Sequence, residues 1–336
     1  MKAIGYHQNL PVDQPRALED LELPAPLPQP RDLLVRVKAV SVNPVDTKVR
    51  RNRVPKDGRP EILGWDAVGT VEAIGAAVTG FEVGDRVYYA GSITRPGANS
   101  ELHVVDERIA AKAPATLDDA QAAALPLTAI TAWELLFDRL RIARGGGEGQ
   151  SLLVIGGAGG VGSILIQLAR QLTRLKVIAT ASRPETRAWC EQLGAHAVVD
   201  HAQPLAQALR DGGHGEVDFV AALTQTDRHY AQIIESLKPQ GAIGIIDDVP
   251  VLDAMKLKTK ALSLHWELMF TRAMFGTPDM AEQGTLLAEV ASLVDAGRVR
   301  TTVGAHYGTI NAANLLKAHA FIESGKAQGK VVLEGF

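Results

Sequence analysis

Apolar and polar positions follow two different periods along the chain, and the change comes near residue 120. Before it, short Val-rich stretches are separated at short intervals by Gly, Pro and Asp, which indicates the strands and turns of a β-rich domain. Strands are expected at 1–6, 32–40, 67–74, 83–89 and 100–105. The polar stretch Arg50–Asp57 between them is expected to be an exposed loop.

From residue 116 onward, helical and strand patterns alternate, which predicts a doubly wound parallel sheet. A helix is expected to begin near Thr116, where Thr116 to Asp119 fit a capping box. Further strands are expected from Ser151 and at 175–180, 197–200, 217–223, 242–246 and 261–268, with helices at about 184–193, 204–210, 227–237 and 280–295. The tail 301–336 has strand character at both ends and a helix between, and it is expected to return to the β-rich domain.

The first strand of the alternating half ends in the pattern Gly157-x-Gly159-x-x-Gly162, and apolar residues at helical spacing follow it. Strand, glycine turn, helix and strand form the unit that binds dinucleotides. Gly157 permits the tight turn, Gly159 lets the backbone approach a pyrophosphate, and Gly162 lets the helix pack on the strand. The pyrophosphate then binds the free N–H groups at the helix start, where Gly160 and Val161 lie. The alternative is a glycine-rich turn of another α/β protein, against which the flanking elements argue.

The residues after the second strand indicate which nicotinamide cofactor is bound. In such a unit, an Asp or Glu about 20 residues after the glycine pattern binds the ribose 2′-hydroxyl of NAD. Here the strand is followed by Ser182 and Arg183, and the first acid is Glu185 in the next helix. An Arg at this place accepts a 2′-phosphate, so NADP(H) is favoured, with Ser182 and Arg183 as candidate binding residues. Ser182-x-x-Glu185 also fits a capping box. In the alternative interpretation, Ser182 is therefore simply the N-cap of the next helix.

Composition and charge narrow the function classes. The 336 residues suffice for two domains, and 46% hydrophobic with 22% charged residues suits a globular protein. With a net charge of −3 and no basic run, neither nucleic acid nor a membrane surface is an expected partner. No leader and no apolar stretch long enough for a bilayer is expected, which favours a cytoplasmic location. The single cysteine, Cys190, excludes an internal disulfide and is expected to be a packing residue.

Several motifs together resemble the medium-chain dehydrogenase/reductase superfamily, namely Gly64–Gly69, Gly84–Val87, Leu125–Trp133 and the Gly157 pattern. The similarity extends over essentially the whole chain and is greatest to the quinone oxidoreductases and the zinc-type alcohol dehydrogenase-like proteins. The resemblance implies a Rossmann doubly wound parallel sheet plus a GroES-like β-rich catalytic domain. The expected domains are 1–124 (GroES-like), 125–272 (Rossmann, NADP-binding) and 273–336 (return to the catalytic domain).

The chain departs from the zinc-dependent members of that superfamily at their ligand positions. Their Gly-His-Glu motif, whose His binds zinc, is Gly64-Trp65-Asp66 here, and Asn43 stands where they have a Cys ligand. None of the nine His falls in a recognisable ligand motif. Because zinc prefers nitrogen and sulfur ligands, these departures imply that no metal is bound.

Without a metal, an electron-poor substrate is favoured, namely a quinone or an α,β-unsaturated carbonyl, because hydride addition then moves charge onto a carbonyl oxygen. The segment that faces the cofactor in the relatives supplies the catalytic candidates. Asn43 would donate its amide N–H to the developing oxyanion. Lys48 would supply a positive charge or a proton, unless it is simply an exposed lysine. Thr131 lies where relatives touch the nicotinamide, or is a helix-surface threonine.

The favoured function is therefore a zinc-independent, NADPH-dependent reductase of quinones or enones. The alternative enzyme is an alcohol or aldehyde dehydrogenase, and the alternative of another class is an NADPH-binding sensor or structural protein with little turnover. A homodimer is expected because Ala261–Leu268 forms the last strand of the sheet, an open edge that needs covering. Asp46 is interpreted as holding a loop, and Trp65 and Trp266 as cleft wall or core.

Overall fold

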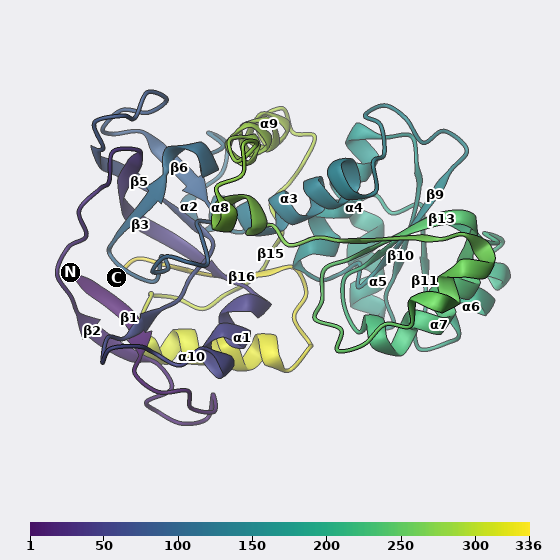
Figure 1. Ribbon diagram of the computed structural model, residues 1–336, viewed down its shortest axis with the longest axis horizontal. Helices are drawn as coiled ribbons and strands as arrows, with labels where there is room; N and C mark the ends of the chain where they lie inside the picture. The colour runs from purple at the N-terminus through teal and green to yellow at the C-terminus, as the bar shows by residue number, and fades with distance from the viewer. The chain divides into compact units, whose positions relative to one another are not determined.

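The computed structural model describes all residues from Met1 to Phe336, and the chain forms two compact units (Figure 1). The β-rich unit comprises Met1–Ile130 and Phe270–Phe336, and the parallel-sheet unit comprises Thr131–Met269. The divisions after Ile130 and Met269 lie within a few residues of the expected domain boundaries at 124 and 272.

The β-rich unit contains two sheets, and strands from the tail complete the larger one. The seven-stranded sheet has the order β15-β16-β3-β5-β6-β8, with β7 also paired to β3, and the smaller sheet has the order β2-β1-β4. The strands are β1 (Lys2–Tyr6), β2 (Glu19–Glu22), β3 (Asp32–Val42), β4 (Glu61–Ile62), β5 (Ala67–Ile74), β6 (Arg86–Tyr89), β7 (Leu102–Asp106), β8 (Ala110–Lys112), β15 (Val303–His306) and β16 (Lys330–Glu334). Because β16 pairs antiparallel with β3, the end of the chain lies beside residues near position 40.

Two helices of the β-rich unit, Pro44–Asn52 and Thr271–Phe275, are not predicted by the sequence pattern. The helices of this unit are α1 (Pro44–Asn52), α2 (Asp119–Ala123), the start of α3 (Pro126–Trp133), α8 (Thr271–Phe275), α9 (Glu282–Asp295) and α10 (Ala312–Glu323). Helix α1 lies against α10 (Figure 1), and the guanidinium of Arg50 is fully buried there, 2.6 Å from Glu323 Oε1 and 3.3 Å from His319 Nδ1. The expectation that 50–57 is an exposed loop is therefore wrong at its start. The polar sequence around Arg50 is typical of an exposed loop, but the ion pair with Glu323 buries Arg50.

The parallel-sheet unit confirms the predicted doubly wound sheet. Its strand order is β11-β10-β9-β12-β13-β14, and every neighbouring pair is parallel. The strands are β9 (Ser151–Ile155), β10 (Lys176–Thr180), β11 (Ala197–Val199), β12 (Val217–Ala222), β13 (Leu237–Ile245) and β14 (Ser263–Trp266). The helices are α4 (Gly160–Leu172), α5 (Pro184–Gln192), α6 (Leu205–Asp211) and α7 (Thr226–Ser236), and the π-helical turn Glu134–Arg139 extends α3.

Both faces of this sheet are covered, which explains its nearly continuous apolar strands. On one face, alternate strand residues such as Leu153, Val220 and Ile243 pack with side chains of α6 and α7 in one buried cluster. On the other face Leu135 approaches so closely that a side chain at Gly244 would lie 2.4 Å from its Cδ1. Strand β14 forms one edge of the sheet. Trp266, which the sequence analysis interprets as cleft wall or core, is 52% exposed there and so is not a core residue.

Two further sequence expectations need correction. The helix near residue 116 begins later, because Asp118 is its N-cap and accepts the Gln121 N–H at 2.7 Å.

One helical stretch, Asp119–Arg139, is also long and apolar enough to cross a membrane by length and composition, contrary to expectation. Because 83% of its most apolar window is buried inside the protein, as in a core helix, it is weak evidence for a membrane span.

Candidate active site

Four buried polar side chains meet in the β-rich unit, and we call them the Asp66 cluster: Asn43, Asp46, Asp66 and Lys330. Asn43 directly follows β3, Asp66 directly precedes β5, and Lys330 is the first residue of β16. The register that pairs Val331 with Val42 places Lys330 opposite Asn43. Each of the four residues is 2% exposed or less, so their polar atoms depend on one another rather than on water.

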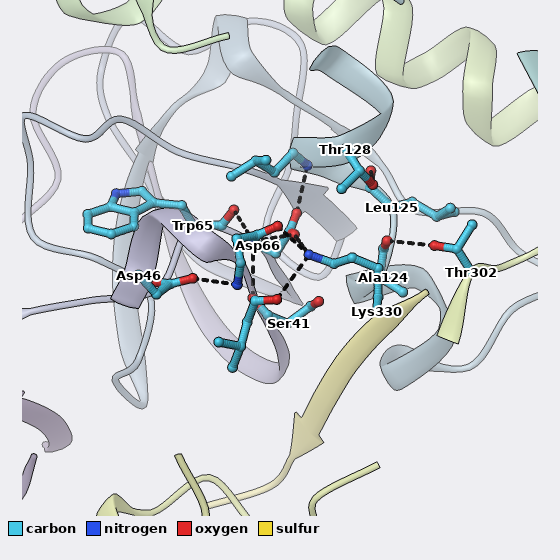
Figure 2. Close-up of polar contacts among 12 residues, drawn as sticks. Ser41, Asp46, Trp65, Asp66, Ala124, Leu125, Thr128, Thr302 and Lys330 are labelled. Carbon is cyan, nitrogen blue, oxygen red and sulfur yellow. Dashed lines mark hydrogen bonds and ion pairs between the residues drawn. The ribbon is translucent and has the colours of Figure 1, made fainter. Parts of the chain in front are cut away.

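Asp66 is the centre of this cluster (Figure 2). Its Oδ1 accepts the Leu127 N–H at 2.7 Å, at the start of α3, where a carboxylate also suits the positive end of the helix. Its Oδ2 accepts the Asn43 side-chain amide at 2.8 Å and the Lys330 ammonium at 2.9 Å. Burial raises the pKa of Asp66, while Lys330 and these hydrogen bonds lower it and so favour the ionised form.

Lys330 uses its three N–H groups on three oxygens. Besides Asp66, it donates to the Asn43 side-chain oxygen and to the Val42 carbonyl oxygen, the latter at 3.3 Å. The Asn43 amide also faces the Ser41 and Trp65 carbonyl oxygens at 3.4 and 3.5 Å. The expected oxyanion donor therefore directs its N–H groups at protein oxygens.

Asp46 holds a loop through the backbone, as its interpretation from the sequence states. Its Oδ2 accepts the Asn43 N–H at 2.7 Å, and its Oδ1 accepts the Gly64 N–H at 3.0 Å. Burial raises the pKa of Asp46 to about 7, because the two backbone hydrogen bonds and Lys330 offset the desolvation only in part. The carboxyl thus ties the start of α1 to the turn that presents Trp65.

The other two catalytic candidates, Lys48 and Thr131, and the tryptophan Trp65 lie outside the Asp66 cluster. Lys48 is half-buried on α1. Thr131 is 5% exposed on α3 and belongs to the parallel-sheet unit. Trp65 is buried, donates its indole N–H to Ser92 O at 3.2 Å, and packs edge-on against Phe270 with ring centroids 6.1 Å apart.

The glycine turn of the parallel-sheet unit has the geometry of a dinucleotide site, with one change of roles. Gly156, not Gly157, has the positive φ of +84° that the tight turn requires. A side chain at Gly157 would instead lie 2.8 Å from Ala179 Cβ, so packing restricts that position. A Cβ at Gly162 would lie 2.4 Å from Gly156 O, which confirms the close approach of helix and turn.

The start of α4 is open to an anion. Gly159 is the N-cap and carries no side-chain cap, and nothing lies nearer than 3.4 Å to a Cβ built there. The first N–H groups of this 13-residue helix, which begins with Gly160 and Val161, are therefore available to a phosphate. Thr180, which sequence reasoning missed, fixes the turn because its Oγ1 accepts the Gly156 N–H at 3.1 Å.

Beyond β10, the structure places the two candidate cofactor residues at the start of α5. Ser182 is exposed, and Arg183 rather than Ser182 is the N-cap, so the proposed capping box does not form. Pro184 in the first turn fixes the helix start instead. Arg183 Nε lies 3.2 Å from Glu185 Oε1, in an exposed ion pair that a phosphate could replace.

Two buried groups of the parallel-sheet unit complete the chemical inventory. Cys190 is a free, fully buried thiol whose pKa burial raises to about 12, as expected for a packing residue. Glu267, just after β14, accepts the Arg139 Nε–H at 2.8 Å, and Glu134 Oε2 lies 3.7 Å from Nη2 of the same guanidinium. Sequence reasoning missed this group, since Glu267 is 128 residues from Arg139 along the chain.

A parallel dinucleotide-type sheet joined to a β-rich unit with a buried polar cluster defines a two-domain, nicotinamide-dependent oxidoreductase. Residues 29–115 match the family of alcohol dehydrogenase GroES-like domains, and residues 193–333 match the zinc-binding dehydrogenases. The chain belongs to the medium-chain dehydrogenase/reductase superfamily, among its zinc-type alcohol dehydrogenase-like and quinone oxidoreductase members.

Known relatives carry names of both kinds. A zinc-type alcohol dehydrogenase-like protein of Staphylococcus aureus is 40% identical over 99% of both chains, and a quinone oxidoreductase of Pseudomonas aeruginosa is 32% identical over 95% of this chain and 96% of its own. A crystal structure from Rhizobium etli, provisionally described as a zinc-dependent alcohol dehydrogenase, is 56% identical with a TM-score of 0.97 over 100% and 98% of the two chains. The Escherichia coli quinone oxidoreductase complexed with NADPH is 25% identical with a TM-score of 0.83 over 99% and 100%.

The family name implies a zinc ion, but the residues at the expected ligand positions do not fit one. The Trp65 indole is a donor only, and the Asn43 oxygen already accepts from Lys330. The Asp66 carboxylate holds the same ammonium, which would repel a second cation at this place. No group of three or more His, Cys, Asp or Glu side chains in the chain is arranged to hold a metal ion.

Proposed function

We propose that this protein is a metal-independent, NADPH-dependent reductase of quinones or α,β-unsaturated carbonyls. The observation that carries the proposal is the Lys330 ammonium, which lies between Asn43 and Asp66 at the expected ligand positions. Oxidation of a simple alcohol requires stabilisation of an alkoxide, which zinc supplies in enzymes that bind it. An electron-poor acceptor needs less of this help, because its own carbonyl takes up the charge.

The cofactor preference rests on the parallel-sheet unit. Bound NADPH supplies the hydride, and the chain supplies position and electrostatics. The uncapped N–H groups at the start of α4 bind the pyrophosphate, and Gly159 leaves room for it. Arg183 binds the 2′-phosphate, and no acidic residue ends β10 to bind a free 2′-hydroxyl. The complex of the E. coli quinone oxidoreductase with NADPH supports this choice by similarity.

In the β-rich unit, the Asp66 cluster acts on position rather than on the reacting atoms. Asp46 holds the backbone of Asn43 and Gly64 in place, and Lys330 with Asp66 holds the Asn43 side chain. Lys48 and Thr131 are then the candidates for direct contact, Lys48 as a charge or proton donor for the substrate oxygen and Thr131 at the nicotinamide.

Steady-state assays with purified, tag-free protein test this function. NADPH with a quinone, and NADPH with an enone, should give turnover, whereas NADP⁺ with primary alcohols should give little. Elemental analysis should find no stoichiometric metal, and a chelator should leave the activity unchanged. Turnover with alcohols alone, lost on chelation together with bound zinc, would instead support an alcohol dehydrogenase, the reading that the names of the S. aureus and R. etli proteins favour. Saturable NADPH binding with no turnover on either acceptor class would indicate a sensor or structural protein.

Two properties complete the proposal. The protein acts on a small electrophile in the cytoplasm, and neither a membrane nor a nucleic acid takes part. It functions as a homodimer that pairs the exposed edge of β14, since an open sheet edge is otherwise free to pair with other chains.

A further inference from the structure

We propose that Lys330 is the resident cation of the β-rich unit: its ammonium occupies a set of oxygen ligands that binds a divalent metal ion once the lysine is removed. This inference rests on the proposed metal-independent function and adds the residue responsible for it. Lys330 is thereby a positioning residue, which acts on the site through Asn43 and Asp66.

The three oxygens around the ammonium are typical ligands of a hard cation. They are a carboxylate oxygen of Asp66, the side-chain oxygen of Asn43 and the backbone oxygen of Val42. Carboxylate, amide and backbone carbonyl oxygens are the groups that bind Mg²⁺ and Ca²⁺ in proteins. In this chain, one ammonium with three N–H donors satisfies all three, and the side chain is 3% exposed.

The charges of the cluster require a cation. Asp66 and Asp46 bring two carboxyl groups into one buried site, and Lys330 is the cation whose charge lowers the pKa of both. A buried carboxylate that loses its counter-charge is strongly unfavourable. Removal of the Lys330 charge must therefore be compensated, either by a proton or by another cation that enters the vacated space.

The ammonium also determines which way the Asn43 amide faces. A lysine only donates hydrogen bonds and a carboxylate only accepts them. Lys330 therefore selects the Asn43 oxygen, and Asp66 selects its NH₂ group. With a neutral residue at 330, the Asn43 oxygen loses its donor, and only the acceptors of its NH₂ group, Asp66 foremost, fix this orientation.

Metal titration of single variants tests the proposal. Lys330→Ala is compared with wild type and with Lys326→Ala, which removes an exposed lysine four positions earlier. Each protein is stripped with a chelator and titrated with Mg²⁺ and, separately, with Ca²⁺, while calorimetry reports binding and thermal unfolding reports stability. We expect one saturable site per chain in Lys330→Ala alone, with a midpoint of unfolding that rises with ion concentration. Wild type and Lys326→Ala should show neither response.

The double variant Lys330→Ala/Asp66→Asn locates the site. It loses the carboxylate together with the ammonium and should bind the ions at least about tenfold more weakly than the single variant, or about 1.4 kcal/mol. Equal binding in the single and double variants, no binding in Lys330→Ala, or a saturable site in wild type would each overturn the proposal.

A folding defect is also informative. If Lys330→Ala refolds only with the ion present, the ion has replaced the ammonium, and the proposal is supported. If it refolds neither with nor without the ion, the proposal is overturned. Since the readout is ion binding, it does not depend on which substrate is reduced, so failure of the proposed activity and failure of this inference are distinguishable.

Discussion

Arg183 and Glu185 form an ion pair at the start of α5, with Arg183 Nε 3.2 Å from Glu185 Oε1. The two side chains are 42% and 60% exposed, so solvent screens the ion pair and it contributes little to the stability of the fold. A 2′-phosphate offers two negative charges and a fork of oxygens that matches guanidinium geometry. On the proposed NADPH preference, the phosphate replaces Glu185 as the partner of Arg183, and Glu185 is not the ribose ligand because it lies in the helix beyond the strand end.

We expect Arg183→Ala to weaken NADPH binding and to leave NADH binding unchanged. A hydrogen bond to a charged group is worth about 1.5–3 kcal/mol, and therefore about tenfold to a hundredfold in the dissociation constant. NADH has no 2′-phosphate to lose. Fluorescence titration of both cofactors measures the two effects, and Glu185→Gln is the matched control, with NADPH affinity equal to or above that of wild type. An equal loss for both cofactors would mean general damage to the site, and no loss for either would mean that Arg183 does not bind the 2′-phosphate.

The two glycines of the α4 start should respond differently to the same added methyl group. In Gly162→Ala the new Cβ lies 2.4 Å from Gly156 O, a backbone atom that cannot rotate away, so we expect the fold to lose about 1–3 kcal/mol. In Gly159→Ala the nearest atom is 3.4 Å away, so stability should change by less than about 0.5 kcal/mol while cofactor affinity falls. Urea unfolding and cofactor titration of both variants separate packing from binding. Equal destabilisation by both would contradict the assigned roles.

The sequence predicts those parts of the fold and of the candidate site that depend on residues close together along the chain. The strand, glycine turn and helix around Gly159 lie within about 30 residues, so their periodicity predicts the dinucleotide-binding unit, and the alternation of such elements after residue 116 predicts the doubly wound sheet. The sequence does not identify Gly156 as the residue with the positive φ, because the nearby Gly157, Gly159 and Gly160 are equally able to adopt it. Only the three-dimensional structure shows that Gly157 is restricted by its packing against Ala179 and that Gly156 makes the turn.

The Asp66 cluster shows where such prediction ends. Lys330 is 264 residues from Asp66, and only the pairing of β16 with β3 brings them together. Lys330 directly precedes the apolar residues Val331–Leu333, as an exposed lysine at the end of a strand often does. The neighbouring sequence therefore does not predict that Lys330 is buried. Arg50 is a similar case, because a partner 273 residues away turns an apparent loop residue into a fully buried one.

Glu267 should make stability dependent on pH. Burial and the neighbouring Glu134 raise its pKa from the ordinary value of 4.5 to about 9, so the folded protein holds a proton that the unfolded chain releases. This contribution to stability is complete below the unfolded pKa of 4.5 and is lost as the pH rises toward 9. Glu267→Gln keeps the shape without the ionisation, so its stability should vary less over this range.

The measurement is urea unfolding of Glu267→Gln and wild type at about pH 5 and pH 9. Wild type should lose on the order of a few kcal/mol more than the variant between the two values, since each unit of pKa shift corresponds to about 1.4 kcal/mol. Glu185→Gln, which neutralises an exposed carboxylate, should behave as wild type. Parallel curves for wild type and Glu267→Gln would mean that Arg139 keeps Glu267 ionised in the folded protein.

The last prediction concerns the edge of the parallel sheet. Strand β14 pairs with β13 on one side only. Its last residue, Trp266, and the nearby Leu268 are 52% and 51% exposed. If a second copy pairs this edge across a two-fold axis, each subunit buries the same residues. A charge introduced at this edge is then buried close to the identical charge of the other subunit, and the two repel each other. We therefore expect wild type to be a dimer by light scattering at micromolar concentration and Trp266→Glu to be a folded monomer. Met274→Glu, a similarly apolar but less exposed position on α8 in the β-rich unit, should remain a dimer. A monomeric wild type would refute the dimer, and a dimeric Trp266→Glu would place its interface elsewhere.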